Sequence, residues 1–497
     1  MGVDFPLSSP LELKFHYHAR DMYVFDETWP VFQEMANITN MTLKNTGNIV
    51  GTNSVEQFQL AAVDRFPDDI YGGNNITTYF MEYGPDGAFI PLNEYWDYLP
   101  NFKAYLDANP DVEAVITAYD GNIYHIPYIQ DGDTARTWFI RTDWLDNLGL
   151  EVPTTVQELE DVLIAFRDDD PNGNGLNDEI PYFNDKYTEM MRLVNLWDAR
   201  CYGQDASTER VIPVEDGSVY HAWTADEFRD AIYELSRWYD MGLIDKEIFT
   251  KGNAARREYL PGDIGGVTHE WVASTSAYND TVTGIDGFAF EVFAPPITEN
   301  GNQWEEHARL KVRPDGWAVS SSCKSPEEAF AYMDYFFSDY GRIISNYGVE
   351  GISYELVDGH PTFTDEVLNG DVAVNTFLES EMGAQLKHGY WMDYDYEYQW
   401  THEIGRAGVD LYNSSDFSVL QMPPLVFNEA QKAVIDSKRA NIVAYQDEMT
   451  MKWIMGSPDL VYQEWDTYLA QCELLGISEL VNAYQEAYTS YLEIAGN

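Results

Sequence analysis

The sequence predicts an α/β protein with more than one compact unit. The chain has 497 residues, of which 45% are hydrophobic, and this is enough for two to four units of ordinary size. Segments with the two-residue period of strands are followed by segments with helical spacing, and several helices begin with capping residues. Such alternation is typical of an α/β fold, in which ligand groups lie at the carboxyl ends of strands.

The first elements follow the order strand, loop, helix. Apolar and polar residues alternate over 11–17, which predicts a strand, and residues 28–37 have helical spacing. The next pair is a helix at 54–62 and a strand at 69–73 that ends in two glycines. A later strand, 265–271, begins with a glycine pair and ends in Trp271.

Helix starts are marked most clearly in the middle and last parts of the chain. The capping residues are Thr155 with Glu158, Thr224 with Glu227, Ser325 with Pro326 and Glu328, and Asn428 with Gln431. The helix that follows Asn428 is expected to reach Thr450, and residues 465–492 continue in helical spacing. Because no repeat or low-complexity linker occurs, ordinary strands are expected to join the units.

The composition excludes several classes of partner. The chain carries 84 acidic and 29 basic residues, a formal net charge of −55 without a block of like charges, and this field repels nucleic acid and anionic membranes. No run of about 18 apolar residues occurs, so no membrane-spanning helix is expected. Aromatic residues make up 15% of the chain and suit carbohydrate recognition. The three cysteines, Cys201, Cys323 and Cys472, indicate neither a disulfide framework nor a metal cluster.

One segment has the chemistry of a calcium loop. Oxygen-bearing side chains recur at every second position around a glycine-rich turn between residues 170 and 179. The predicted ligands are Asp170, Asn172, Asn174, the carbonyl of Leu176, Asp178 and Glu179. The loop departs from an EF-hand because its twelfth position is Pro181 rather than Glu, and a turn without an ion remains the alternative. The expected role of the ion is structural.

Several segments together resemble a known family. They are residues 121–127, 139–150, 153–155, the calcium loop, 334–335, 347–354 and 465–468. This combination resembles the family 1 extracellular solute-binding proteins of ABC importers, in particular their long, lipoprotein-type branch, which serves oligosaccharide uptake in bacteria. The likeness covers nearly the whole chain. It is specific for the family but not for the ligand.

The resemblance implies a periplasmic-binding-protein-like fold of two α/β lobes, joined by hinge strands, with a ligand held between them. The expected N-terminal lobe is 1–127 plus 306–350, and the expected C-terminal lobe is 128–305 plus 351–497, with terminal helices able to span both. Crossings are expected near Pro127, Arg313–Trp317 and Glu350. The resemblance also implies that the loop at 170–179 binds a structural Ca²⁺.

Partners and location follow from the same resemblance. A monomer that delivers an oligosaccharide to the permease subunits of an ABC transporter is expected, at the outer cell surface and held there by a lipid anchor. The first residues, Met1-Gly2-Val3-Asp4, look like an initiator methionine placed before a mature chain. The signal peptide and the lipid anchor are therefore expected to be absent from this sequence.

Candidate ligand residues lie where strands end. They are Arg20, Asp21, Tyr71, Asn74, Trp271, Trp317, Tyr390, Trp391 and Trp400. The family that the chain resembles often places a sugar-stacking tryptophan at the position of Trp271. Rings and carboxylates alternate over 390–400, which suggests a second platform for sugars. Packing in the core is the open alternative for each tryptophan, and Trp138 and His18 are weaker candidates.

The chain is expected to bind rather than to catalyse. A glycoside hydrolase would also need carboxylates and rings, and an adhesive carbohydrate-binding surface protein is a further alternative. However, no Gly-x-Ser-x-Gly elbow, phosphate loop or His-Glu-x-x-His motif occurs. A neutral oligosaccharide is the expected ligand, because a polyanion would need a basic pocket and only scattered residues such as Arg20, Arg136 and Arg313 could supply one.

Overall fold

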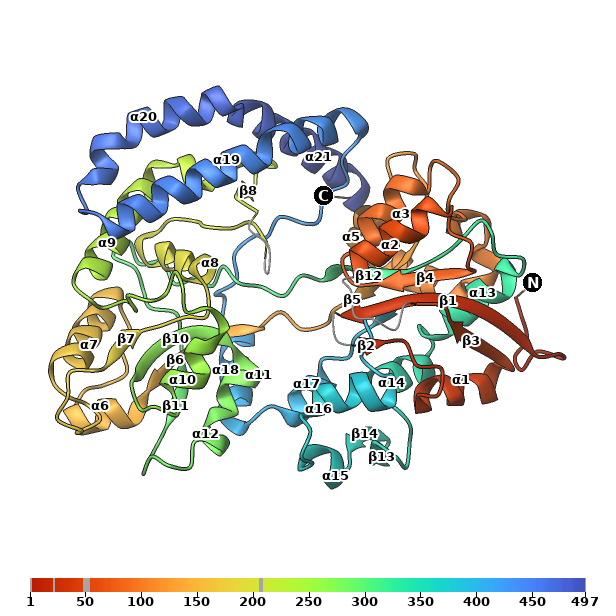
Figure 1. The fold of residues 1–497 in the computed structure, drawn as a ribbon, viewed down its shortest axis with the longest axis horizontal. Coiled ribbons are helices and arrows are strands. Elements are labelled where there is room, and N and C mark those ends of the chain that lie inside the picture. Colours follow the sequence, from red (N-terminus) through yellow and green to blue (C-terminus); the bar gives the residue numbers. More distant parts are fainter. Residues whose placement is uncertain (1, 21–22, 48–53, 205–208, 497) are drawn as a thin grey trace. The chain divides into compact units, whose positions relative to one another are not determined.

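The computed structural model describes residues 2–20, 23–47, 54–204 and 209–496, which form two compact units (Figure 1). The first unit comprises Met1–Asp131, Lys311–Trp400 and Ser490–Asn497, and the second comprises Gly132–Leu310 and Thr401–Thr489. Each unit has its own sheet with helices around it. The protein therefore has the α/β architecture that the alternating pattern predicts.

The first unit is built on a mixed sheet of seven strands in the described residues, in the order β15-β5-β12-β4-β1-β2 with β3 beside β1. The strands are β1 (Leu11–Arg20), β2 (Tyr23–Val24), β3 (Met41–Asn45), β4 (Ile70–Gly73), β5 (Ile126–Ile129), β12 (Val312–Val319) and β15 (Tyr390–Trp391). β1 runs parallel to β3 and β4, whereas β12 is antiparallel to both β4 and β5. A Cβ atom at Gly72 would lie 2.8 Å from the Tyr17 ring, so only glycine allows β4 to pack this closely.

Two hydrophobic clusters, one large and one small, lie between this sheet and the helices that cover it. The helices are α1 (Pro30–Thr39), α2 (Ser54–Val63), α3 (Thr77–Tyr83), α4 (Pro100–Ala108), α5 (Pro110–Ile116), α13 (Pro326–Tyr335), α14 (Asp339–Tyr347), α15 (Asp365–Leu368), α16 (Val374–Phe377) and α17 (Asp395–Trp400). A separate hairpin joins β13 (Tyr354–Val357) to β14 (His360–Phe363). Asp334 on α13 accepts hydrogen bonds from the Asn101 and Phe102 amides and so caps the start of α4.

The second unit contains a four-stranded sheet in the order β11-β6-β10-β7 and a small hairpin, β8–β9. The strands are β6 (Arg136–Arg141), β7 (Ile180–Tyr182), β8 (Val211–Pro213), β9 (Val219–His221), β10 (Gly265–Trp271) and β11 (Phe290–Phe293). β10 is antiparallel to β6 and parallel to β7. A Cβ atom at Gly266 would lie 2.6 Å from the Phe166 ring, which explains why glycine stands at the start of β10.

The helices of the second unit include the long helices of the C-terminal part. They are α6 (Thr142–Leu148), α7 (Val156–Asp168), α8 (Tyr187–Met190), α9 (Asp226–Asp240), α10 (Ala255–Tyr259), α11 (Val272–Ser276), α12 (Tyr278–Thr281), α18 (Glu403–Asn413), α19 (Glu429–Met455), α20 (Leu460–Leu475) and α21 (Ile477–Ala495), of which the part from Ser490 onward belongs to the first unit. In Figure 1, α19 and α20 run side by side, and α9 packs against both.

Two of the four predicted helix caps are confirmed. Thr155 with Glu158 starts α7, and Asn428 with Gln431 starts α19, each with both reciprocal bonds. The Thr224 cap is wrong, because that hydroxyl donates to the His221 carbonyl and α9 begins after Ala225. α13 does start at Pro326, but no side-chain bond from Ser325 caps it.

The helical stretch expected over 465–492 is interrupted. Gly476 has φ 95° and ends α20 before α21 begins. A residue with a side chain would be strained in this left-handed conformation, so the glycine marks a true helix end.

The unit boundaries also differ from those expected. Residues 351–400, expected in the C-terminal lobe, belong to the first unit, because β15 extends that unit's sheet beside β5 and Tyr354 and Phe363 enter its core. The chain changes units at Trp400–Thr401 rather than near Glu350. The segments 128–131 and 306–310 likewise exchange units relative to the expectation.

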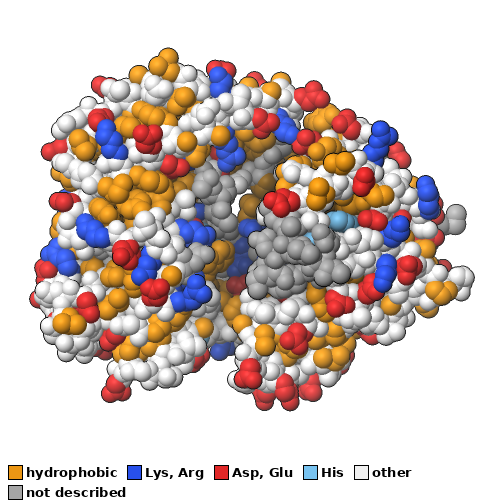
Figure 2. All heavy atoms as spheres, viewed as in Figure 1, with side chains coloured by type: hydrophobic (Ala, Val, Ile, Leu, Met, Phe, Trp, Pro, Cys, Tyr) orange, Lys and Arg blue, Asp and Glu red, His pale blue; other side chains and the backbone are white. Residues whose placement is uncertain are grey.

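The surface reflects the acidic composition. On the face drawn in Figure 2, acidic side chains are scattered over both units and do not gather in one patch. Among the described helices, none combines the length and the apolar character that crossing a membrane requires.

Candidate functional site

A pocket of about 420 Å³ opens where β10 ends in the second unit. Its lining residues come from β6, β10 and neighbouring helices and loops, and they are Arg136, Asp185, Lys186, Arg256, Arg257, Glu270, Trp271, Ser274 and Tyr278. We call it the Trp271 pocket. Its size lies within the range of small-molecule sites.

Trp271 is held by its neighbours but is not buried. It is the last residue of β10, pairs across the sheet with Arg136 on β6 and immediately precedes α11. The Arg136 guanidinium lies over the indole at 4.6 Å from the ring centroid, and the His307 ring meets it edge-on at 5.6 Å. The side chain remains partly exposed in the pocket. An aromatic ring fixed in this way can stack against a flat apolar ligand surface.

A buried ionic layer lies beneath the pocket. Arg136 is only 3% exposed, and its Nη1 atom lies 3.1 Å from Glu189 and 3.4 Å from Glu270. Glu189 also pairs with Arg192 at 3.1 Å. Burial opposes ionisation of Glu189, but the charges of Arg192 and Arg136 outweigh it and lower the pKa of this carboxyl. The layer is therefore charged, and its charges are paired.

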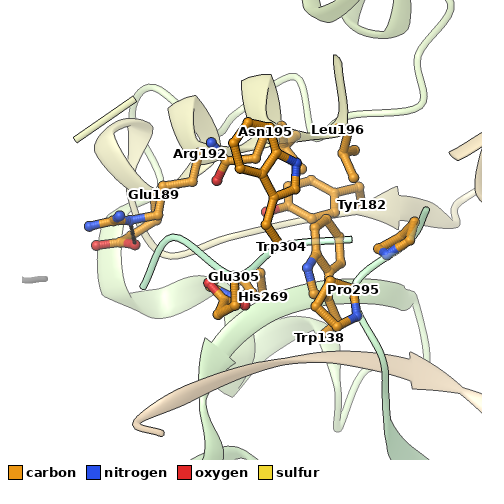
Figure 3. Close-up of a pocket in the computed structure, with 12 residues that line it drawn as sticks. Trp138, Tyr182, Glu189, Arg192, Asn195, Leu196, His269, Pro295, Trp304 and Glu305 are labelled. Carbon is orange, nitrogen blue, oxygen red and sulfur yellow. Dashed lines mark hydrogen bonds and ion pairs between the residues drawn. The ribbon is translucent and has the colours of Figure 1, made fainter. Parts of the chain in front are cut away.

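Figure 3 shows the small cavity beside this layer, in which Glu189 and Arg192 lie next to each other. Its volume of about 20 Å³ is enough for roughly one water molecule. His269 and Glu305, drawn together in Figure 3, form a buried pair at 2.9 Å. A cavity of this volume is too small to hold a sugar.

The basic residues of the Trp271 pocket differ in their partners. Arg256 is fully engaged, with Asp185 at 3.1 Å, the Thr275 hydroxyl at 2.7 Å and Glu270 at 3.6 Å. Lys186 and Arg257 are exposed. Neither of their side chains makes a hydrogen bond or ion pair with any residue that the structure describes.

Three predicted ligand residues are wrong because they are buried in the core of the first unit. Tyr71, Trp317 and Tyr390 are each 0% exposed. The Tyr71 hydroxyl donates to Asp68, and the Tyr390 hydroxyl donates to Gln385. Trp317 lies in an aromatic cluster with the His388 ring at 4.5 Å. A ligand cannot reach any of these rings without unpacking the core.

The other predicted positions remain accessible or lie outside the described residues. Asn74 is partly exposed at the end of β4. Trp391 and Trp400 are partly buried against the first unit's core, and Arg342 covers the Trp391 ring at 3.7 Å. The expected alternation over 390–400 ends early, because β15 is only two residues long and α17 follows. The side chain of Arg20 and the whole of Asp21 lie outside the described residues.

Six residues of the pocket were not expected from sequence patterns: Asp185, Lys186, Arg256, Arg257, Ser274 and Tyr278. The signal that could have found two of them is the pair Arg256-Arg257, adjacent basic residues in a very acidic chain. Their place in the pocket depends on how α10 packs in the second unit, which local patterns do not reveal.

The predicted calcium loop forms a compact turn between α7 and β7. The Asp170 carboxylate accepts hydrogen bonds from the Asn174 and Gly175 amides, and the Asn174 side chain donates to Asp178. Both carboxylate oxygens of Glu179 are buried without a hydrogen-bond partner. Burial raises the pKa of Glu179, and the charges of Asp178 and Asp170 add to the effect.

These features fit a hard cation, because Glu179 lacks any group that would compensate its buried charge. Among the described residues, no three histidine, cysteine, aspartate or glutamate side chains are grouped closely enough to hold a metal by themselves. Amide and carbonyl oxygens, such as those of Asn172, Asn174 and Leu176, would have to complete the site.

Comparison with known proteins identifies relatives along almost the whole chain. No family model matches. The fructooligosaccharide ABC transporter substrate-binding protein FusA of Streptococcus pneumoniae is 24% identical over 516 residues, which cover 99% of this chain and 92% of FusA. The polygalacturonan/rhamnogalacturonan-binding protein YtcQ of Bacillus subtilis is 36% identical over 426 residues, which cover 80% of this chain and 76% of YtcQ.

A solved structure agrees with these relatives. The alginate-binding protein AlgQ2, determined without calcium ion, is 40% identical to this chain and superposes with a TM-score of 0.83, covering 98% of this chain and 100% of AlgQ2. The identity and coverage of YtcQ and AlgQ2 exceed what a shared fold alone would require. The chain therefore belongs to the substrate-binding proteins of ABC transporters.

Proposed function

We propose that this protein captures an oligosaccharide for import and delivers it to the permease subunits of an ABC transporter. The observation that carries the proposal is Trp271, a partly exposed ring at the end of β10 that Arg136 holds in place within a pocket of about 420 Å³. Such a ring offers a pyranose an apolar surface, and the polar residues around it can bond to hydroxyl groups.

The relatives support a carbohydrate ligand but differ in its charge. FusA is named for fructooligosaccharides, whereas AlgQ2 and YtcQ are named for alginate and for polygalacturonan and rhamnogalacturonan. A further relative, LipO of Bacillus subtilis, is named a lipoprotein, which supports a lipid-anchored protein at the outer cell surface. We infer that the protein acts as a monomer and that it is a receptor rather than an enzyme.

Replacing Trp271 by alanine is expected to weaken oligosaccharide binding by about 1–3 kcal/mol, because the change removes a stacking surface but no backbone hydrogen bond. Isothermal titration calorimetry with the oligosaccharide that the wild type binds measures the loss. The fold should survive, since the ring is partly exposed.

Trp317→Ala is the matched control. That ring is 0% exposed, so the cavity left behind should cost about 3–5 kcal/mol of unfolding free energy while affinity in the folded protein is retained. A destabilised Trp271→Ala protein with normal affinity would remove Trp271 from the binding site.

We also propose that the loop at 170–179 binds a structural Ca²⁺. The support is the oxygen-rich donor set and the buried, unpartnered carboxylate of Glu179. The AlgQ2 structure is one without calcium ion, and a structure of an EF-hand mutant of FusA is also known, which is consistent with an ion in these relatives.

Removal of calcium with a chelator is expected to lower the melting temperature. A ligand present at about a hundred times its Kd stabilises the folded state by about 2.7 kcal/mol, and chelation removes that contribution. Differential scanning calorimetry with and without chelator measures it, and Asp178→Ala should reproduce the effect. Glu151→Ala removes an exposed carboxylate outside the loop and should change nothing. If chelation leaves the melting temperature unchanged, the loop is a turn without an ion.

A further inference from the structure

The Trp271 pocket is locally basic in a strongly acidic protein. Four basic side chains line it against two acidic ones, Asp185 and Glu270, although the chain as a whole carries a net charge of −55. Charges of the distant surface are screened over about 8 Å at physiological ionic strength, so the ligand experiences mainly the local charges. The pocket therefore attracts anionic ligands, although the net negative charge of the whole chain repels them.

The basic residues divide into two pairs with different tasks. Arg136 is 3% exposed and neutralised by Glu189 and Glu270, and its planar group supports the Trp271 ring. Arg256 is committed to Asp185 and to the Thr275 hydroxyl. Both arginines thus shape the pocket, and a ligand would have to break existing bonds to use them.

Lys186 and Arg257 are different because they are exposed and make no ion pair or hydrogen bond with the described residues. Binding an anion costs them no existing partner. A carboxylate is the anionic group that sugars of uronic-acid type carry, and a guanidinium binds it with two parallel hydrogen bonds.

We propose that the Trp271 pocket selects oligosaccharides that carry carboxylates, and that Lys186 and Arg257 bind these carboxylates. This inference rests on the proposed oligosaccharide-binding function. It replaces the neutral ligand that the net charge suggested, because the basic pocket that a polyanion requires is present.

The test compares acidic and neutral sugars of equal length. The probes are a galacturonate tetramer and its fully methyl-esterified form, together with a mannuronate tetramer and mannotetraose, each titrated into the full chain by calorimetry. The wild type should bind at least one acidic tetramer more tightly than its neutral counterpart. Lys186→Gln with Arg257→Gln should weaken that binding by about 10- to 100-fold and should weaken neutral binding by a clearly smaller factor.

A control variant makes the same change in net charge elsewhere. Arg65→Gln with Lys324→Gln removes two exposed cations of the first unit and should leave acidic binding unchanged. Tighter binding of the neutral sugars by the wild type would overturn the inference and leave the proposed function intact. Acidic binding that survives the Lys186 and Arg257 changes would overturn the residue assignment. Failure to bind any oligosaccharide, in a wider screen as well, would overturn the proposed function itself.

Discussion

Arg136→Met is expected to lower the free energy of unfolding by about 3–5 kcal/mol. The change leaves Glu189 and Glu270, which are 7% and 1% exposed, each with one cationic partner fewer, and removing one partner of a buried ion pair is strongly destabilising. It also removes the guanidinium from the face of Trp271, so ligand affinity should fall. Unfolding in guanidinium chloride, monitored by circular dichroism, gives the free energy of unfolding, and calorimetry gives the ligand affinity.

Two further variants separate charge from shape. Arg136→Lys keeps the positive charge but loses the planar group that stacks on the Trp271 ring. Compared with Arg136→Met, it should restore the free energy of unfolding more fully than the ligand affinity. Adding Glu270→Gln to Arg136→Met removes one of the two buried carboxylates that have lost a cationic partner, so part of the lost stability should return. A loss below about 1 kcal/mol in Arg136→Met would show that the ionic layer does not stabilise the pocket.

Helices and strands were predictable from the sequence where their local sequence signals agree with the packing of the folded chain. The strand at Leu11, the glycine-rich strand that ends at Trp271 and the helix after Thr155 all have the expected positions, because periodicity, glycine and capping act locally. The Thr224 cap failed because a hydroxyl can bond to a nearby carbonyl instead of an amide.

The candidate site was less predictable because burial depends on tertiary contacts. Trp271 and Trp317 both lie on glycine-containing strands, yet one is partly exposed in a pocket and the other lies in an aromatic core. The basic lining was missed for the same reason, since Lys186, which precedes α8, and Arg257, on α10, line one pocket only once the unit has folded.

Acidification is expected to destabilise the folded protein between about pH 7.5 and pH 5.5. Burial lowers the pKa of His125, His221 and His388 to about 3, whereas a histidine in the unfolded chain titrates near 6.5. In this range the unfolded chain binds protons that the folded chain excludes, so each histidine costs about 1.4 kcal/mol and the three together about 4 kcal/mol.

Carboxyl groups whose pKa is raised in the folded chain act in the opposite direction, among them Asp334, Glu179 and Asp245. Burial raises the pKa of Asp334 to about 6, so the folded chain takes up a proton there before the unfolded chain does, and this offsets about 1 kcal/mol. Chemical unfolding at a series of pH values gives the net slope. Single variants are needed to assign it to particular groups.

His388→Leu isolates one contribution. The His388 ring is 2% exposed between Trp317 and Phe336, and neither ring nitrogen has a hydrogen-bond partner, so an apolar side chain of similar size loses no bond. The variant should be at least as stable as the wild type near pH 7.5. Between pH 7.5 and pH 5.5, its free energy of unfolding should fall by about 1.4 kcal/mol less than that of the wild type. His360→Leu changes an exposed histidine on β14 and should keep the wild-type slope. An unchanged slope in His388→Leu would mean that the buried ring takes up its proton as readily in the folded as in the unfolded chain.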